Sequence, residues 1–188
     1  MKKGFTLIEL LVVIAILAVL MSVVVVTINP AEMLKKTRDT KRISDLDALR
    51  TALNLYVTDG LSFPNNGCVT CVPGLVTNTS CVSYISSSTS QSVATTGWLG
   101  FNLGNISSGS PLSALPIDPK PSTNTGNTPN GWHAYILKTN NTSSTFKLMA
   151  NMESAYYSST TPASAGDVES TDGGSMSDVY EVGSDVNL

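Results

Sequence analysis

Apolar residues are concentrated at the start of the chain. The stretch Phe5–Ile28 is apolar except at Thr6, Glu9, Ser22 and Thr27. A helix of about 20 apolar residues crosses the hydrocarbon core of a bilayer. The apolar core of a cleaved secretory signal is shorter, about 7–15 residues, and no small-x-small cleavage site closes this stretch. The pattern therefore predicts a transmembrane helix over residues 5–28.

One acidic residue distinguishes this helix from a plain membrane anchor. Glu9 lies in the apolar stretch and is the only acidic residue before Glu32. A carboxylate inside a membrane span costs about 2.5–3.5 kcal/mol on insertion scales, and such residues usually have a partner and a role. The basic residues Lys2 and Lys3 precede the span. This basic leader is typical of an exported protein and favours an inside amino terminus.

At Asn29-Pro30 the continuous apolar run ends, and apolar residues then recur at helical spacing. Asn29 is a good helix N-cap, Pro30 suits the first helical position, and Glu32 has the spacing of a capping-box carboxylate. Proline also removes a hydrogen bond from any helix that continues through it. We therefore predict a kink or short break at Thr27–Pro30 and a new helix after it.

This second helix is amphipathic and is expected to end at Asp59, because Gly60 suits its C-terminal cap. Its apolar residues recur at steps of three or four and predict one face packed on a C-terminal domain; they include Ile43, Leu46, Leu49, Leu53 and Tyr56, with Leu34, Ala52 and Val57 beside them. Its charged residues predict a solvated face; they are Lys35, Lys36, Arg38, Asp39, Lys41, Arg42, Asp45 and Asp47. The alternative functions for this face are lateral contact between subunits and attraction to anionic lipid.

Alternation of apolar and polar residues, which is typical of strands, is clearest in the second half of the chain. Trp132–Thr139 and Thr145–Met152 predict two strands joined by a hairpin at 140–144, and Asp178–Val182 predicts a last strand. Shorter strand candidates are Val82–Ser86 and Gly97–Leu103. A helix needs a sheet face on which to bury its stripe, so the expected fold class is α+β with a small antiparallel sheet.

These elements divide the chain into five parts. We expect a basic leader at 1–4, a transmembrane helix at 5–28 and an amphipathic helix at 29–60. A polar, cysteine-containing loop region follows at 61–119, and an antiparallel sheet with an acidic C-terminal tail at 120–188.

Charge and motifs exclude several classes of function. The net charge is −3, and residues 61–117 contain no Lys, Arg, Asp or Glu. Nothing in this distribution indicates specific nucleic-acid binding. The chain has one histidine, no Gly-rich phosphate loop and no Gly-x-Ser-x-Gly motif, so no enzymatic activity is predicted.

Three cysteines, Cys68, Cys71 and Cys81, are present. In an exported domain an odd count predicts one disulfide and one leftover thiol, and the spacing leaves the pairing open. One alternative is a zinc site of the three cysteines and His133, and another is a Cys-x-x-Cys redox motif.

No cofactor is predicted, although calcium is an alternative at the acidic tail. Asp167, Glu169, Asp172 and Asp178 offer carboxylate oxygens, which calcium takes as ligands. A solvated acidic tail is the simpler interpretation of the same residues.

The amino terminus resembles that of type IV pilins and of the pseudopilins of type II secretion. The resemblance is carried by a basic leader, Gly4-Phe5-Thr6, an apolar pair, Glu9 and the long apolar run. It implies that a prepilin peptidase cleaves after Gly4 and methylates the new amino terminus at Phe5. It also implies assembly through Phe5, Thr6 and Glu9, with Glu9 facing the free amine of a neighbouring subunit.

The resemblance further implies a pilin fold and a single-pass protein in the inner membrane with its head outside. The protein would contact lipid first, and then an assembly platform and further copies of itself in an extracellular or periplasmic filament. A pilus subunit serving adhesion, motility or DNA uptake is the first hypothesis, and a type II secretion pseudopilin is the second. Leu115-Pro116-Ile117-Asp118-Pro119 resembles a turn that many pseudopilins carry before their sheet. A single-pass anchored binding protein that does not polymerise is the alternative from another class.

Overall fold

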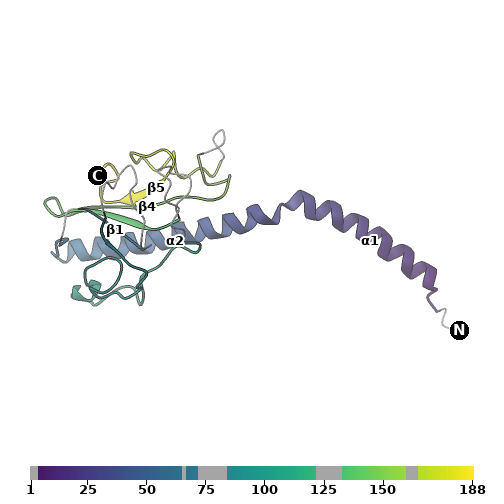
Figure 1. Cartoon of the computed structure of the whole chain (residues 1–188), viewed down its shortest axis with the longest axis horizontal. Coiled ribbons are helices and arrows are strands. Elements are labelled where there is room, and N and C mark those ends of the chain that lie inside the picture. Colours follow the sequence, from purple (N-terminus) through teal and green to yellow (C-terminus); the bar gives the residue numbers. More distant parts are fainter. Residues whose placement is uncertain (1–3, 65–66, 72–83, 122–132, 160–164) are drawn as a thin grey trace.

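The molecule consists of a long helical stalk, formed by α1 (Leu7–Ile28) and the start of α2 (Pro30–Thr58), and a head in which α2 packs on a β-sheet (Figure 1). The computed structural model describes residues 4–64, 67–71, 84–121, 133–159 and 165–188. Helix α1 extends away from the head, and helix α2 runs from the end of α1 into it. The fold is α+β, as predicted.

The break between the two helices lies where the sequence placed it. Asn29 adopts a left-handed backbone conformation with φ 45° and ψ 74°, and its side chain accepts a hydrogen bond from the Glu32 amide. Pro30 follows as the first residue of α2. Asparagine tolerates this conformation better than most residues, and proline cannot continue the preceding hydrogen-bond ladder. The predicted kink is confirmed.

The end of α2 is also set by local chemistry. Gly60 has φ 80°, and its amide donates to the Val57 carbonyl at 3.0 Å. The Leu61 amide donates to the Tyr56 carbonyl at 3.2 Å. This pair of bonds forms a Schellman motif, which a glycine in the left-handed conformation makes favourable.

One sheet of the described residues packs against α2. Its strands are β1 (Gly67–Thr70), β2 (Tyr84–Ser87), β3 (Ile136–Asn140), β4 (Thr145–Ala150) and β5 (Tyr180–Gly183), in the spatial order β2-β1-β3-β4-β5. The β1–β3, β3–β4 and β4–β5 pairs are antiparallel. The β1–β2 pair is parallel. Strand β2 confirms the described part of the candidate at Val82–Ser86, whereas β1 was not predicted.

The core lies between α2 and the sheet. Leu46, Leu49, Leu53 and Tyr56 of the predicted stripe are buried there, whereas Leu34 is 61% exposed because it precedes the head. Four aromatic rings pack together at the end of α2, in pairs with centroids 5.0–5.9 Å apart: Tyr56, Phe63, Phe101 and Phe146. The α2 stripe thus fixes how the stalk is attached to the head.

The predicted strand at Gly97–Leu103 is wrong. This segment contains turns, with the Gly97 amide bonded to the Ala94 carbonyl and the Gly100 amide bonded to the Gly97 carbonyl. Gly100 has φ 77°, which a strand does not accommodate. Trp98 is nevertheless fully buried, and its indole donates to the Pro116 carbonyl at 3.0 Å. The apolar side chains that indicated a strand anchor a loop to the core instead.

Candidate functional site: the amino-terminal helix and its attachment to the head

The first turn of α1 is closed by a capping box made of Thr6 and Glu9. Thr6 is the N-cap, with extended φ −82° and ψ 151°, and its hydroxyl accepts a hydrogen bond from the Glu9 amide at 3.3 Å. The Glu9 carboxylate accepts in return from the Thr6 amide at 2.8 Å and from the Thr6 hydroxyl at 2.7 Å. This contact was not predicted, although the Thr-x-x-Glu spacing is a known signal for it.

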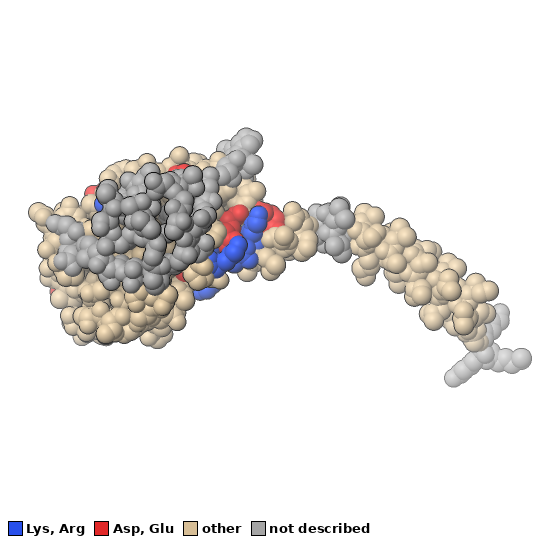
Figure 2. Space-filling view, viewed as in Figure 1, with Lys and Arg blue, Asp and Glu red and all other residues tan. Residues whose placement is uncertain are grey.

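The side chains of α1 have no cover within the molecule. Every residue from Leu7 to Val24 is exposed, and this segment has a mean hydropathy of 3.0. By length and composition it is able to cross a membrane. The visible face of α1 carries no charged side chain, whereas Lys, Arg, Asp and Glu gather where α2 enters the head (Figure 2). An apolar helix of this kind needs lipid or other apolar helices around it.

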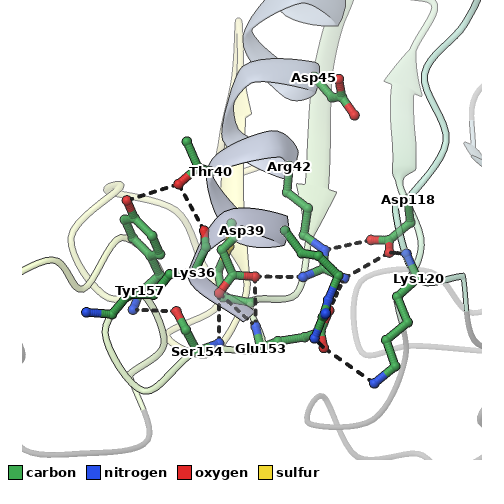
Figure 3. Close-up of polar contacts among 12 residues, drawn as sticks. Lys36, Asp39, Thr40, Arg42, Asp45, Asp118, Lys120, Glu153, Ser154 and Tyr157 are labelled. Carbon is green, nitrogen blue, oxygen red and sulfur yellow. Dashed lines mark hydrogen bonds and ion pairs between the residues drawn. The ribbon is translucent and has the colours of Figure 1, made fainter. Parts of the chain in front are cut away.

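A buried group of charged side chains attaches α2 to the head (Figure 3). We call it the Arg42 cluster; it consists of Arg38, Asp39, Arg42, Asp118 and Glu153. The Arg42 Nε and Nη2 atoms donate to the two carboxylate oxygens of Asp118 at 2.7 and 2.8 Å. Its Nη1 donates to Asp39 at 2.6 Å, and its Nη2 also donates to Glu153 at 2.6 Å. One guanidinium thus joins α2, the segment between β2 and β3, and the chain after β4.

The other members complete this attachment. Arg38 makes a two-pronged contact with Glu153 at 2.8 and 2.7 Å. The Asp39 carboxylate accepts from the backbone amides of Glu153 and Ser154 at 2.9 and 2.7 Å. Asp39 and Arg42 are fully buried. The prediction that this charged stretch is a solvated face is therefore wrong for these two residues, because their partners come from distant parts of the sequence.

The electrostatics of the cluster favour the ionised forms of Arg42 and Glu153. Burial opposes the charge on Arg42, but hydrogen bonds and charge attraction from Asp118 and Glu153 outweigh it and raise the pKa of the guanidinium. Burial also opposes ionisation of Glu153, yet hydrogen bonds from Arg38 and Arg42 lower the pKa of its carboxyl to about 2. Removing one partner from such a group leaves an uncompensated buried charge.

Two further contacts tie the start of α2 to the segment after β4. Glu32 accepts a hydrogen bond from the Ala155 amide at 2.5 Å, so its carboxylate reaches the head and not the N-cap that the sequence suggested. The Lys36 ammonium lies 4.2 Å from the centre of the Tyr156 ring. These contacts hold the first turns of α2 against the base of the head.

One cysteine is in a disulfide, so the alternatives of a zinc site and a redox pair are not formed. Cys68 is disulfide-bonded, whereas Cys71 is a free thiol that is 1% exposed. Burial raises the pKa of Cys71 to about 11, although its sulfur accepts a hydrogen bond from the Tyr135 amide at 3.1 Å. Cys81 lies outside the described residues. A disulfide sulfur cannot serve as a thiolate ligand, so neither the zinc site with His133 nor a Cys68–Cys71 redox pair is formed.

The four acidic residues proposed for calcium are engaged separately. The carboxylate of Asp167 accepts from the Glu169 amide at 3.1 Å, and that of Glu169 accepts from the Met152 amide at 2.8 Å. The Asp172 carboxylate accepts from other backbone amides, and the Asp178 carbonyl accepts from the Asn151 side chain. In the part of the chain that the structure describes, no three His, Cys, Asp or Glu side chains are placed to hold a metal ion. Calcium binding stays an untested alternative to the solvated acidic tail.

Comparison with known proteins assigns the amino-terminal segment alone. Residues 1–25 match the family model described as a prokaryotic N-terminal methylation motif. No curated protein and no solved structure matches the chain. The match covers the leader, the Thr6–Glu9 capping box and most of α1.

Proposed function

We propose that this chain, which carries the amino-terminal signal of type IV pilins and pseudopilins, is a structural subunit of a type IV pilus or pilus-like filament. The observation that carries the proposal is a fully exposed apolar helix whose first turn holds a single carboxylate. In this function a prepilin peptidase cleaves after Gly4 and methylates Phe5. The subunit resides in the inner membrane with its head outside, until an assembly platform adds it to a filament.

The chemistry of Glu9 supports polymerisation over simple anchoring. Cleavage before Phe5 creates an α-amine that is cationic near neutral pH. When that amine is buried among apolar helices it needs an anionic partner, and Glu9 of a neighbouring subunit supplies one. Each subunit then donates its own amine to one neighbour and receives the amine of another neighbour at its Glu9 carboxylate. A contact of this heterologous kind continues from subunit to subunit and generates a helical filament.

The arrangement of the head fits display on the outside of such a filament. The Arg42 cluster and the α2 stripe fix the head to α2, while α1 stays clear of it. Lipid surrounds α1 before assembly, and the α1 helices of other copies replace the lipid afterwards. The lack of charge at 61–117 favours a pilus serving adhesion, motility or DNA uptake over a pseudopilin.

Replacement of Glu9 by leucine tests the proposal. Glu9→Leu is expected to leave membrane insertion and cleavage intact and to reduce filaments by at least about tenfold, since a buried amine without its partner loses several kcal/mol. Filaments sheared from cells are quantified by immunoblot and electron microscopy. Asp47→Leu is the matched control, because Asp47 is an exposed carboxylate of α2. Normal filament yield from Glu9→Leu would exclude the pairing, whereas absence of filaments from the unmodified chain would favour a plain anchored protein.

A further inference from the structure

We propose that an open cavity at the base of the head binds the phosphate of a phospholipid headgroup while the subunit resides in the membrane. The inference rests on the membrane residence given in the proposed function, and it does not depend on the Glu9 pairing. The cavity has a volume of about 330 Å³. Ligand sites in proteins have volumes of about 300–1,000 Å³. The cavity is therefore large enough for a headgroup and too small for a whole lipid.

Polar side chains from four separate parts of the chain line this cavity. Lys35 belongs to α2, Lys120 to the segment between β2 and β3, and His133 to the residues before β3. The segment after β4 supplies three more polar side chains, those of Asn151, Glu153 and Ser158. The fold thus brings two ammonium groups together with several groups that form hydrogen bonds.

The cavity favours an anion. Of its described lining residues only Glu153 is acidic, and Arg38 and Arg42 already donate to that carboxylate at 2.6–2.8 Å. The Lys120 ammonium is 59% exposed and lies 3.4 Å from Glu153 (Figure 3), and Lys35 is 43% exposed and lies 3.3 Å from a carboxylate of its own helix. Exposed ion pairs of this kind contribute little stability. Both ammonium groups are therefore free to turn towards an anion in the cavity.

His133 adds an unsatisfied polar group beside the two lysines. Burial and the nearby charge of Arg42 lower the pKa of its imidazole, so the ring is neutral at pH 7. Its buried Nδ1 atom has no hydrogen-bond partner among the described residues. A neutral imidazole has one donor and one acceptor nitrogen, and a buried polar atom without a partner is destabilising. A ligand whose oxygens bond to the ring therefore stabilises this side of the cavity.

The position of the cavity along the stalk places it at the membrane surface. Helix α1 has 22 residues, which corresponds to about 33 Å and matches the hydrocarbon core of about 30 Å. Lys35 follows the end of α1 by seven positions, or about 10 Å of helix. The bend at Asn29 shortens its distance from the membrane further. Because a lysine side chain is long and flexible, its ammonium group reaches the headgroup layer from this position.

Apolar side chains next to the cavity favour a lipid over a free anion. Met33 and Leu34 directly precede Lys35 on the stalk, and they are 55% and 61% exposed. Tyr156, from the segment after β4, is 38% exposed, and its ring lies against the Lys36 ammonium. Tyrosine is enriched where membrane and water meet. Acyl chains cover such apolar side chains while the phosphate occupies the cavity, whereas a free phosphate ion leaves them exposed.

The test uses the full chain labelled with ¹⁵N-histidine in dodecyl maltoside micelles. His133 is the only histidine, so its ring signals in the nuclear magnetic resonance spectrum are assigned directly. Added dioleoyl phosphatidylglycerol is expected to shift these signals to saturation. Dioleoylglycerol, which has the same acyl chains and no phosphate, is expected to leave them unchanged. Inorganic phosphate is expected to bind at least about tenfold more weakly than the lipid, because it buries no apolar surface.

Replacement of the two lysines tests the site itself. Lys35→Gln and Lys120→Gln are each expected to weaken binding of the lipid about fivefold, and together about 25-fold, as for about 1 kcal/mol per lysine near an anionic surface. Lys35→Arg combined with Lys120→Arg keeps both charges and is expected to restore binding. Lys41→Gln is the matched control, because Lys41 is an exposed lysine of α2 that does not line the cavity. Unchanged His133 signals before lipid is added show that each variant is folded.

Four results would overturn the inference. They are no saturable shift with the phospholipid, an equal shift with dioleoylglycerol, equally tight binding of inorganic phosphate, and unchanged lipid binding when both lysines are glutamine. The outcome is separate from the test of the proposed function. If Glu9→Leu lacks filaments and the phospholipid gives no shift, only the lipid site fails. If Glu9→Leu assembles normally and the phospholipid gives the shift, the pairing fails and the lipid site stands.

Discussion

At the scale of single residues, Glu153 shows how the head is fixed to its helix. Its carboxylate receives Arg38 and Arg42, and its backbone amide donates to Asp39. The sequence around Glu153 gives no sign of this, because Arg38 and Arg42 lie 115 and 111 positions away. Charged residues on a helix predict a solvated face by default, and only the fold shows which of them are buried with partners.

The lowered pKa of Glu153 predicts a specific loss of stability in acid. A carboxyl whose pKa falls on folding contributes stability above its unfolded value and loses it as the pH drops through the folded value. For Glu153 that window runs from about pH 4.5 down to about pH 2. We expect the free energy of unfolding to fall by about 2 kcal/mol across this window, allowing for solvent screening.

The measurement is chemical denaturation at successive pH values, followed by the fluorescence of the buried Trp98 in detergent-solubilised chain. Glu153→Gln is expected to be less stable at pH 7 and to lose less stability between pH 4.5 and 2. Asp47→Asn, at an exposed site, is the control and should keep the slope of the unmodified chain. An unchanged slope in Glu153→Gln would contradict the assignment. Glu169, whose pKa burial raises to about 7, loses its contribution at higher pH and does not interfere in this window.

At the scale of elements, the junction of α1 and α2 is the one place where the stalk is interrupted. Asn29 caps α2 from a left-handed conformation, and Pro30 begins it. Both residues act through local sterics and hydrogen bonding, so the break could be predicted from the sequence. The junction separates a helix without cover from a helix whose later turns are packed on the head.

Replacement of Pro30 by alanine is expected to join α1 and α2 into a straighter helix. Alanine restores the missing amide donor and removes the ring, which disfavours a continuous helix by about 3 kcal/mol. Spin labels at positions 22 and 44 report the result, and the distance between them is expected to increase. Asn29→Gly is the control, because glycine adopts the left-handed conformation readily and keeps the break. An unchanged distance in Pro30→Ala would show that Asn29 or lipid maintains the bend.

At the scale of the whole molecule, α1 and the head are separate in structure. All residues of α1 from Leu7 to Val24 are exposed, whereas α2 provides the buried stripe and the Arg42 cluster. The stability of the head therefore depends on α2, and the membrane behaviour of the chain depends on α1. In the proposed function, this separation allows the surroundings of α1 to change from lipid to other helices without unfolding the head.

A chain that begins at Asn29 is accordingly expected to fold. Its free energy of unfolding should match that of the full chain within about 0.5 kcal/mol, as for changes away from packed regions. Both chains are measured by denaturation in the same detergent solution. A chain that begins at Ile43 is the control, because it lacks all three α2 members of the Arg42 cluster and should not unfold cooperatively. A large loss of stability in the longer truncation would mean that α1 contributes to the head.

Features that depend on neighbouring residues could be predicted before the structure was known. The apolar stretch 5–28, the break at Asn29-Pro30, the α2 stripe, the end of α2 at Gly60 and the hairpin of β3 and β4 follow from periodicity and capping chemistry, which act within a few residues. The amino-terminal motif belongs to the same group, since its residues are consecutive. The Thr6–Glu9 capping box was readable in the same way.

Features that join distant residues became visible only in the folded chain. Arg42 is buried because its guanidinium forms ion pairs with Asp118 and Glu153. The Gly97–Leu103 segment is held by burial of Trp98 in the core, so apolar content alone misled the strand prediction. The parallel pairing of β1 and β2 likewise joins separate parts of the sequence. In each case the stabilisation comes from burial and from contacts between residues far apart in the sequence. Local sequence patterns do not indicate which distant residue will be the partner.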